Sequence, residues 1–446
     1  MTHAATASTR TRTTRTSEQF VIEGGSPLTG TVRAAGNKNA ALPIVAGVLL
    51  SSGTVTLHDV PDIVDVLLLL ELLESMGVQV ERLGPNSWRF DDMGSVNATE
   101  LDPGLCERIR GSLLLAGPLV ARHGEVKIPV PGGDVIGRRR IDTHVIALEG
   151  LGARYDFVDS YHFTAPTGGL RGADIFLDEP SVTGTENAVM AAVLATGDTV
   201  LENVACEPHV QDLCRFLVSM GAQIGGIGSN VLRITGVSEL GGTEYTIQPD
   251  HIEVGSFIGL AAVTGGELVI ENAGKLAQLR PLLTGFARLG VEMVIEGDSI
   301  RIPPEQRLTI RDDIGSQIPK IEDGPWPQFP ADLTSIAITV ATQSSGTVMI
   351  HEKMFESRMF FTDKLVAMGA RIVLCDPHRA VISGPARLRG ARMESPDIRA
   401  GMSLLIAALC ADGRSTISNI WQIDRGYERI DDRLRALGAH IERVPG

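Results

Sequence analysis

The sequence predicts an α/β protein made of six similar units arranged in two lobes. The first observation is a helix that ends in Gly and recurs six times, each Gly being followed by Val or Ala that leads into a strand. A Gly at this place supplies the left-handed C-cap of a helix. The second observation is length, because six units of about 70 residues fill nearly all of the 446 residues. The capping glycines are Gly77, Gly152, Gly221, Gly290, Gly369 and Gly438.

Each unit is expected to follow the order β-α-β-α-β-β. In the third unit a small-residue helix at Glu186–Ala195 is followed by a strand at Asp198–Leu201. The Gly-capped helix comes next, and strands at Ala222–Ile224 and Asn230–Ile234 complete the unit. Because each unit can bury its own helices beneath its strands, a simple solenoid is not expected. We expect two lobes of three units, with the chain crossing near Gln248-Pro249-Asp250.

The composition excludes several classes of protein. The chain carries 40 basic and 54 acidic residues, a net charge of −14, and 4% aromatic residues, which argues against a nucleic-acid binder. No apolar run reaches the roughly 20 residues of a membrane span. Residues 1–17 lack the apolar stretch of a secretory signal, and we expect a disordered extension, with a transit peptide as the alternative because no acidic residue precedes Glu18. Five scattered cysteines without a CxxC pair favour a reducing cytoplasm.

Neither a metal nor a cofactor is expected. The ten histidines form no HxxxH or HExxH pattern, and no GxGxxG fingerprint lies between a strand and a helix. The sequence does not indicate an oligomeric state.

Two segments in the first lobe are candidates for binding an anion. Gly36–Pro43 opens the first helix, where Lys38 adds a charge to the helix N-terminus, although an ordinary capped helix has the same features. The Pro- and Gly-rich loop Pro131–Asp142 places Asp134 beside three arginines. Such a loop is either a solvated surface loop or a lid that brings an acid and a cation to a substrate.

The second lobe contributes three arginines and one acid. Arg358, Arg399 and Arg425 each lie close to the start of a helical stretch. Arginine suits bidentate binding of carboxylate and phosphate, but each residue alone is also typical of a structural ion pair. Asp332 lies where the first helix of the fifth unit begins, and its simplest interpretation is an N-cap.

Taken together, these segments resemble the enolpyruvyl transferases that act on UDP-N-acetylglucosamine. The resemblance covers residues 18–445 and includes Pro180–Gly184, Phe329–Asp332 and Ile423–Ile430. It implies an inside-out α/β barrel of two lobes with three repeats each. The first lobe would be residues 38–248. Residues 18–37 would join residues 249–446 in the second lobe, with hinges near residues 37 and 249.

The resemblance also implies a reaction and its residues. The enolpyruvyl group of phosphoenolpyruvate moves to the 3′-hydroxyl of UDP-N-acetylglucosamine, with loss of phosphate, by addition and elimination in the first committed step of peptidoglycan synthesis. The implied catalytic residues are Asp134, Asp332, Lys38 and Arg425. The implied phosphoenolpyruvate-binding residues are Lys38, Arg139 and Arg425 for the phosphate, and Arg358 and Arg399 for the carboxylate.

The acceptor sugar nucleotide would be held by a longer set of residues. By the same resemblance these are Asn39, Arg110, Arg139, Arg140, Ile141, Asp142, Thr143, Glu179, Ser181, Val182, Asp332 and Met354. The partners implied are therefore small-molecule substrates.

The sequence departs from the family pattern at two positions. Asp134 stands where most members have the Cys that protonates C3 of phosphoenolpyruvate and reacts with the epoxide fosfomycin. Without a thiol, the chain is expected to be insensitive to fosfomycin. Arg140 stands where Pro is common, which leaves room for another nucleotide as the acceptor. The same chemistry on shikimate 3-phosphate is a second alternative. A weakly catalytic protein that senses UDP-sugar is the remaining alternative.

Overall fold

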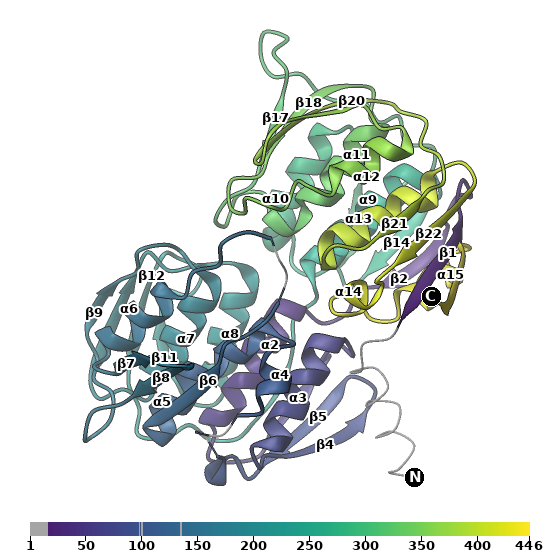
Figure 1. The fold of residues 1–446 in the computed structure, drawn as a ribbon. Helices are drawn as coiled ribbons and strands as arrows, with labels where there is room; N and C mark the ends of the chain where they lie inside the picture. Colours follow the sequence, from purple (N-terminus) through teal and green to yellow (C-terminus); the bar gives the residue numbers. More distant parts are fainter. Residues whose placement is uncertain (1–16, 98, 100, 134–135) are drawn as a thin grey trace. The chain divides into compact units, whose positions relative to one another are not determined.

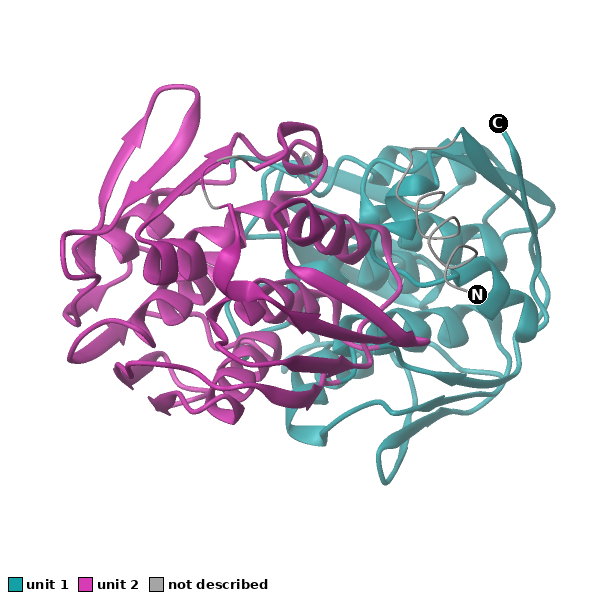
Figure 2. Cartoon of the chain, turned by 90° about the horizontal axis from the view of Figure 1, so that it is seen from below, with its two compact units in different colours: residues 1–35, 134–138, 249–446 teal, residues 36–133, 139–248 magenta. Residues whose placement is uncertain are grey.

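The computed structural model describes residues 17–97, 99, 101–133 and 136–446, and these form two compact units (Figures 1 and 2). Unit 1 contains the described residues among 1–35, 134–138 and 249–446, and unit 2 contains those among 36–133 and 139–248. The expected disordered extension lies almost wholly outside the described residues. Asp134 lies outside them too.

Unit 1 carries three sheets of four strands each, counted over its described residues. In each sheet a central strand pairs with a parallel neighbour on one side and an antiparallel neighbour on the other. In spatial order the strands are β2 (Gly30–Arg33), β14 (Leu268–Glu271), β16 (Ser299–Ile302) and β15 (Val294–Glu296); β17 (Lys320–Glu322), β18 (Gly346–His351), β20 (Arg379–Gly384) and β19 (Ile372–Asp376); and β21 (Arg392–Glu394), β22 (Arg414–Ser418), β1 (Glu18–Glu23) and β23 (His440–Pro445).

Unit 2 repeats this plan, with three strands rather than four described in one sheet. Its sheets are β13 (Thr243–Thr246), β3 (Val55–His58), β5 (Ser87–Asp91) and β4 (Gln79–Gly84); β6 (Glu125–Pro129), β8 (Ser160–Thr164) and β7 (Arg154–Phe157); and β9 (Asp174–Phe176), β10 (Asp198–Glu202), β12 (Val231–Thr235) and β11 (Gln223–Gly225). Six sheets over the described chain match the six units expected from the sequence.

The N-terminal strands complete two of the sheets in unit 1. Strand β1 lies between β22 and β23, so that Phe20 is opposite both Ile417 and Arg443. Strand β2 then pairs in parallel with β14. A strand that belongs by its position to the sixth repeat thus comes from the start of the chain, which closes the ring of three repeats.

Helices fill the interior of each unit, and the sheets lie outside them (Figure 1). In unit 1, α9, α11 and α13 pack against one another and are buried around almost their whole circumference. Most of their side chains are apolar or small, and buried polar ones such as Ser256, Thr339 and Ser403 form hydrogen bonds inside the unit. The helices of unit 1 are α9 (His251–Thr264), α10 (Leu276–Arg288), η4 (Ala331–Leu333), α11 (Thr334–Gln343), α12 (Thr362–Met368), α13 (Ile398–Cys410), α14 (Trp421–Asp424) and α15 (Ile430–Ala436).

In unit 2, α5 and α7 are in contact, as are α2 and α8. The helices of this unit are α2 (Lys38–Gly47), η1 (Val48–Leu50), α3 (Val64–Ser75), η2 (Met93–Ser95), α4 (Pro103–Cys106), η3 (Arg110–Leu115), α5 (Ala116–His123), α6 (Asp142–Gly150), α7 (Val182–Ala192) and α8 (Pro208–Ser219). Over the part of the chain that the structure describes, no helix combines the length and apolar character needed to cross a bilayer.

The six glycines that end the recurrent helices confirm the repeat. All six have positive φ, between 84° and 111°, in the left-handed region expected of a helix C-cap. The predicted element boundaries differ from the observed ones by a few residues; the helix expected at Glu186–Ala195, for example, is α7, Val182–Ala192. The sequence pattern missed its first turn because Ser181, rather than a hydrophobic residue, marks the start by capping Gly184.

The two crossings between the units run beside each other. The backbone N–H of Asp250 donates to the carbonyl of Ala35 in unit 1, and that of Asn37 donates to the carbonyl of Gln248 in unit 2. Gly36 lies between these bonds, where an added Cβ would fall 1.7 Å from the carbonyl oxygen of Asp59. Only Gly fits so close to a neighbouring backbone.

Candidate active site

Asp332 is the centre of the charged cluster in unit 1. It lies in the short turn η4 that leads into α11, and its Oδ1 is 3.1 Å from Nη2 of Arg358. Its Oδ2 is 3.1 Å from both Nε and Nη2 of Arg399. The N-cap interpretation of Asp332 was therefore wrong. Pro330 precedes the turn, no side chain caps η4 or α11, and the carboxylate is held by two guanidinium groups instead.

Arg399 is fixed by the start of α13. Asp397 caps this helix by accepting hydrogen bonds from the backbone N–H of Arg399 at 2.8 Å and of Ala400 at 2.9 Å. The guanidinium lies 5.5 Å from the ring centroid of Tyr427 and donates from Nη1 to its hydroxyl at 3.3 Å. Burial lowers the pKa of Arg399, but the charge of Asp332 and its other acidic neighbours raise it above the usual value. Arg399 therefore stays cationic although it is 5% exposed.

Arg358 reaches the same carboxylate from the segment before α12. It donates from Nη1 to the carbonyl of Ala331 at 3.4 Å, and its guanidinium lies 4.8 Å from the ring centroid of Phe355. Burial lowers its pKa, while Asp332 and Glu352 raise it, and the net shift is upward. Arg358 and Arg399 thus both keep their positive charge in a buried place, where both bind Asp332. An additional anion, such as a substrate carboxylate, is favoured there.

Arg425 follows Arg399 in the sequence of candidate residues and lies directly after α14. Its guanidinium donates to Oε1 of Gln422 at 2.8 Å and lies 5.5 Å from the ring centroid of Trp421. Gly426 allows the turn to approach the start of α13, since an added Cβ would be 2.3 Å from Cγ2 of Ile398 and 3.9 Å from Nη1 of Arg399. The fifth candidate of this unit, Met354, is 38% exposed.

In unit 2, Lys38 begins α2. Asn37 caps the helix by accepting from the N–H groups of Asn39 and Ala40, at 2.8 and 3.1 Å. Lys38 is 8% exposed, and its Nζ forms an ion pair with Asp65 at 3.0 Å. The sequence did not point to Asp65, which lies in α3, 27 residues further along the chain. An anion that binds Lys38 has to compete with this carboxylate.

The far end of the Pro- and Gly-rich loop is held by Arg110. From the start of η3, its Nη2 donates to the carbonyls of Arg139 at 2.9 Å and Arg140 at 3.3 Å. Gly133 lies against the same pair: it has φ of 124°, and an added Cβ would be 3.0 Å from Cβ of Arg110 and 3.6 Å from Nη1 of Arg139. The structure therefore brings Arg110 and Arg139 together.

Arg140 leads a second group, at the start of α6. It forms ion pairs with Asp142 at 3.1 Å and with Asp178 at 2.8 Å. The hydroxyl of Thr143 donates to the other oxygen of Asp178 at 2.8 Å. Asp178 was not singled out from the sequence, although it directly precedes Glu179. Ile141 and Asp142 form the start of this helix, while Ser181 and Val182 start α7.

The described part of the loop that belongs to unit 1 is fastened to the segment after β18. The carbonyl of Ile136 accepts from the N–H of Ser357 at 3.1 Å, and Oε2 of Glu356 accepts from the N–H of Arg138 at 3.2 Å. Between these bonds, Gly137 has φ of 131°, and an added Cβ would be 2.2 Å from Oε2 of Glu356. Glu356 is thus a further residue of this region that the sequence did not reveal.

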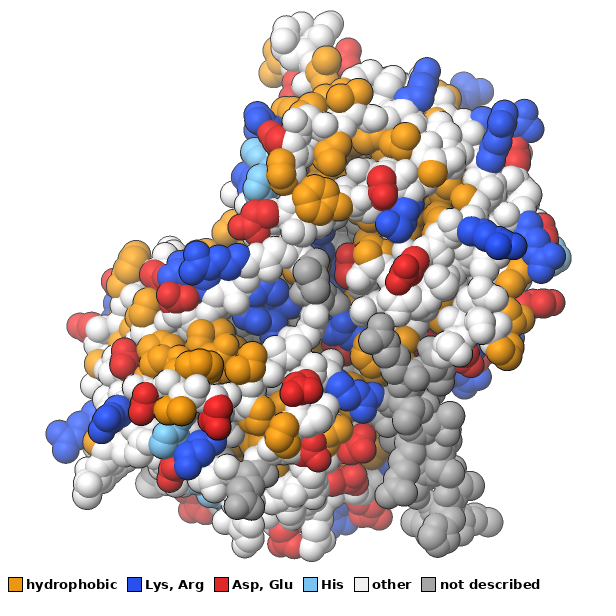
Figure 3. Space-filling model, in the orientation of Figure 1, with side chains coloured by type: hydrophobic (Ala, Val, Ile, Leu, Met, Phe, Trp, Pro, Cys, Tyr) orange, Lys and Arg blue, Asp and Glu red, His pale blue; other side chains and the backbone are white. Residues whose placement is uncertain are grey.

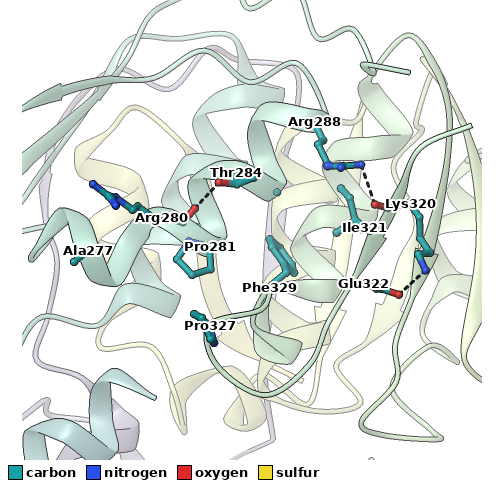
Figure 4. Close-up of a pocket in the computed structure, with 11 residues that line it drawn as sticks. Ala277, Arg280, Pro281, Thr284, Arg288, Lys320, Ile321, Glu322, Pro327 and Phe329 are labelled. Atoms are coloured by element: carbon teal, nitrogen blue, oxygen red, sulfur yellow. Dashed lines mark hydrogen bonds and ion pairs between the residues drawn. The ribbon is translucent and has the colours of Figure 1, made fainter. Parts of the chain in front are cut away.

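A cavity of about 480 Å³ lies elsewhere in unit 1, between α10 and β17 (Figure 4). Phe329 and Pro327 form part of its wall, with Arg288, Lys320 and other residues of α10 and β17. None of the site residues predicted from the sequence lines it. Basic and acidic side chains alternate over the face of the molecule in Figure 3 instead of forming one basic patch. Over the described residues, no group of three His, Cys, Asp or Glu side chains could hold a metal ion.

Comparison with known proteins identifies the family. The family model of EPSP synthase (3-phosphoshikimate 1-carboxyvinyltransferase) matches residues 22–434. The chain belongs to this family. A member from Bradyrhizobium diazoefficiens, named UDP-N-acetylglucosamine 1-carboxyvinyltransferase, is 60% identical over 427 residues, covering 96% of this chain and 98% of that protein. A member of the same name from Treponema denticola is 52% identical over 424 residues, covering 95% and 99%.

Solved structures of the EPSP synthase family confirm the predicted fold class. The enolpyruvyl transferase NikO from Streptomyces tendae superimposes with a TM-score of 0.85 at 24% identity, covering 97% of this chain and 100% of that one. An EPSP synthase from Acinetobacter baumannii gives a TM-score of 0.73 at 19% identity, covering 96% and 100%. The two-lobed α/β barrel of six repeats is thus the fold of this chain.

Proposed function

We propose that this chain transfers the enolpyruvyl group of phosphoenolpyruvate to the 3′-hydroxyl of UDP-N-acetylglucosamine and releases phosphate, in the cytoplasm, as the first committed step of peptidoglycan synthesis. The observation that carries the proposal is the Asp332 carboxylate held by the buried Arg358 and Arg399. It occurs in a chain that is 60% identical to a protein named for this reaction.

Arginine geometry suits the carboxylate end of phosphoenolpyruvate. A guanidinium offers donors in a planar fork that matches two carboxylate oxygens. Arg358 and Arg399 already use this chemistry on Asp332, so a substrate carboxylate would join or replace one of these contacts. Lys38, Arg139 and Arg425 are assigned to the phosphate, whose charge a cluster of cations stabilises during bond cleavage.

The reaction requires one proton acceptor and one proton donor in its first step. The 3′-oxygen bonds to C2 of phosphoenolpyruvate, and its proton passes to Asp332. C3 receives a proton from Asp134, which gives a tetrahedral adduct that still carries the phosphate. In the second step C3 returns a proton to Asp134 while the bond from C2 to the phosphate oxygen breaks, and the proton held by Asp332 leaves with the phosphate. The products are an enolpyruvyl ether and inorganic phosphate. Asp134 must be protonated at the start, which a bound anionic substrate and exclusion of water favour.

UDP-N-acetylglucosamine is assigned to the residues around Arg110 and around Arg140 in unit 2, to Asn39, and to Asp332 and Met354 in unit 1. Arg140, which departs from the family pattern, is ordered by Asp142 and Asp178. Its place in an ion-pair network explains how the position accepts a charged residue. The network lies at the surface, so it orients the helix start more than it stabilises the fold.

A phosphate-release assay tests the proposal. With phosphoenolpyruvate present, we expect release with UDP-N-acetylglucosamine and none with shikimate 3-phosphate or other nucleotides. Asp332→Asn should remove this release, whereas Asp412→Asn, a carboxylate on the surface of the same unit, should retain it. Phosphate release with another acceptor, but none with UDP-N-acetylglucosamine, would overturn the assignment of the acceptor substrate. Binding of UDP-N-acetylglucosamine without any release would favour a sensing protein.

A further inference from the structure

Two buried carboxyl groups lie beside the arginine cluster, at the carboxyl ends of neighbouring strands. Strands β17 and β18 pair in parallel, with Glu322 opposite His351. Asp323 directly follows β17, and Glu352 directly follows β18. Each lies two residues after a buried isoleucine, Ile321 or Ile350, and so points to the same inward face. Asp323 is 1% exposed and Glu352 is 0% exposed.

The pair has polar neighbours but few hydrogen bonds. The backbone N–H of Lys353 donates to Oδ1 of Asp323. Neither carboxylate oxygen of Glu352 has a partner of good geometry among the described residues, and neither does Oδ2 of Asp323 or the hydroxyl of Thr334. The groups that act on Glu352 are Arg358, Asp323 and Thr334, the first residue of α11. Four unsatisfied oxygen atoms in one buried cluster need an explanation.

Electrostatic repulsion between the two carboxyl groups explains these oxygen atoms. Two adjacent carboxyl groups removed from water do not both ionise, because each negative charge disfavours the other. Burial raises the pKa of Glu352 to about 9; the positive charge of Arg358 opposes this shift, and Asp323 adds to it. At neutral pH the cluster therefore holds a proton that the unfolded chain would release.

We propose that Glu352 and Asp323 share one proton and that their single remaining negative charge positions the guanidinium of Arg358. The inference rests on the proposed function, because Arg358 is taken to hold the carboxylate of phosphoenolpyruvate. Nε of Arg358 has no hydrogen-bond partner among the described residues, while Nη1 and Nη2 contact Ala331 and Asp332. The acid pair is a permanent counter-charge on the side of the strands.

This counter-charge is present when phosphoenolpyruvate binds and is kept during the reaction, so its effect on Arg358 is the same in both states. Asp332 becomes neutral when it accepts the proton of the 3′-hydroxyl, so Arg358 loses the charge of its carboxylate partner. The Glu352–Asp323 pair keeps its charge through that step and holds Arg358 in place. Glu352 and Asp323 are thus positioning residues that act on the substrate through Arg358.

The test uses neutral isosteres of each carboxyl group. Glu352→Gln and Asp323→Asn each leave one carboxylate, and the new amide can donate the hydrogen bond that the shared proton made. Each single variant should keep the KM for phosphoenolpyruvate within about twofold. The double variant has no charge left and should raise this KM at least tenfold, with kcat and the KM for UDP-N-acetylglucosamine changed less than threefold. Asp363→Asn, an exposed change of the same kind in unit 1, serves as the control.

Two results would overturn the inference. A double variant with unchanged KM would show that the pair does not position Arg358. A tenfold rise in Glu352→Gln alone would show that Glu352 carries its own charge. An infrared difference spectrum, wild type minus Glu352→Gln at neutral pH, tests the proton without needing the double variant to fold. It should contain the carbonyl band of a protonated carboxylic acid, and its absence would refute the shared proton.

The controls separate this inference from the proposed function. If wild-type protein uses a different acceptor, the same KM comparison is made with that acceptor, and the pair is still tested. If Arg358→Lys leaves the KM for phosphoenolpyruvate unchanged, the role of Arg358 in the proposed function fails. The infrared result then stands independently.

Discussion

Replacing Arg399 with Lys tests the carboxylate clamp while the positive charge is kept. In the structure Arg399 uses Nε and Nη2 on Oδ2 of Asp332 and Nη1 on the hydroxyl of Tyr427. A lysine ammonium is a single point charge and does not reproduce this fork. At least one charge-assisted hydrogen bond to a carboxylate is lost.

The expected magnitude follows from that count. A hydrogen bond to a charged group contributes about 1.5–3 kcal/mol, and each 1.4 kcal/mol corresponds to about a tenfold change in affinity. Arg399→Lys should therefore raise the KM for phosphoenolpyruvate by about 10- to 150-fold. The carboxylate is present in both substrate and adduct, so the loss should appear in KM with kcat nearly unchanged.

The assay is steady-state phosphate release at saturating UDP-N-acetylglucosamine and varied phosphoenolpyruvate. Arg387→Lys is the matched control, because Arg387 is a surface arginine of the same unit that pairs with Asp412. The control should keep wild-type constants. A KM for phosphoenolpyruvate within twofold of wild type, in a variant that unfolds at the wild-type temperature, would refute the role of Arg399.

Three further predictions concern pH, the loop and the acid. Because the folded pKa of Glu352 is about 9 against an ordinary 4.5, the folded state retains a proton that the unfolded state loses, so stability falls as pH rises between these values. Urea titrations from about pH 6 to about pH 8 should show wild type losing up to about 1.4 kcal/mol per pH unit relative to Glu352→Gln; parallel curves would contradict this. Gly137→Ala should lower kcat/KM about 5- to 150-fold, because the new Cβ would collide with Glu356 and strain the loop by about 1–3 kcal/mol. Gly84→Ala is the control and should keep the wild-type kcat/KM, because there is open space around Gly84. Asp134→Ala should abolish phosphate release. Because Asp134 offers no thiolate, fosfomycin should leave the wild-type rate unchanged, and rapid covalent inactivation would refute this.

The repeat was predictable because its signals are local. A helix C-cap needs φ in the left-handed region, Gly adopts it at little cost, and the six cap positions could be read directly from the sequence. The insertion of β1 between β22 and β23 was not visible in the residue pattern. It pairs Gln19 with Ser418, and no local periodicity encodes a contact across nearly the whole chain. Only the family resemblance indicated it.

The candidate site was predictable in its residue types but not in its pairings. Asp332 reads as an N-cap because its partners, Arg358 and Arg399, are 26 and 67 residues away. Asp65 and Asp178 were missed for the same reason. Glu352 did leave a trace in the sequence: it continues the inward positions of Val348 and Ile350, where an acid is out of place. Acids on the core face of a strand are the signal that would have found it.

Analysis of the product tests the central claim most directly. Wild-type protein is incubated with phosphoenolpyruvate and UDP-N-acetylglucosamine, and the products are identified by mass spectrometry and by NMR of the sugar ring. The proposed function predicts one enolpyruvyl ether at the 3′-oxygen for each phosphate released. Unmodified UDP-N-acetylglucosamine, together with an enolpyruvyl product when shikimate 3-phosphate or another nucleotide is supplied, would contradict it.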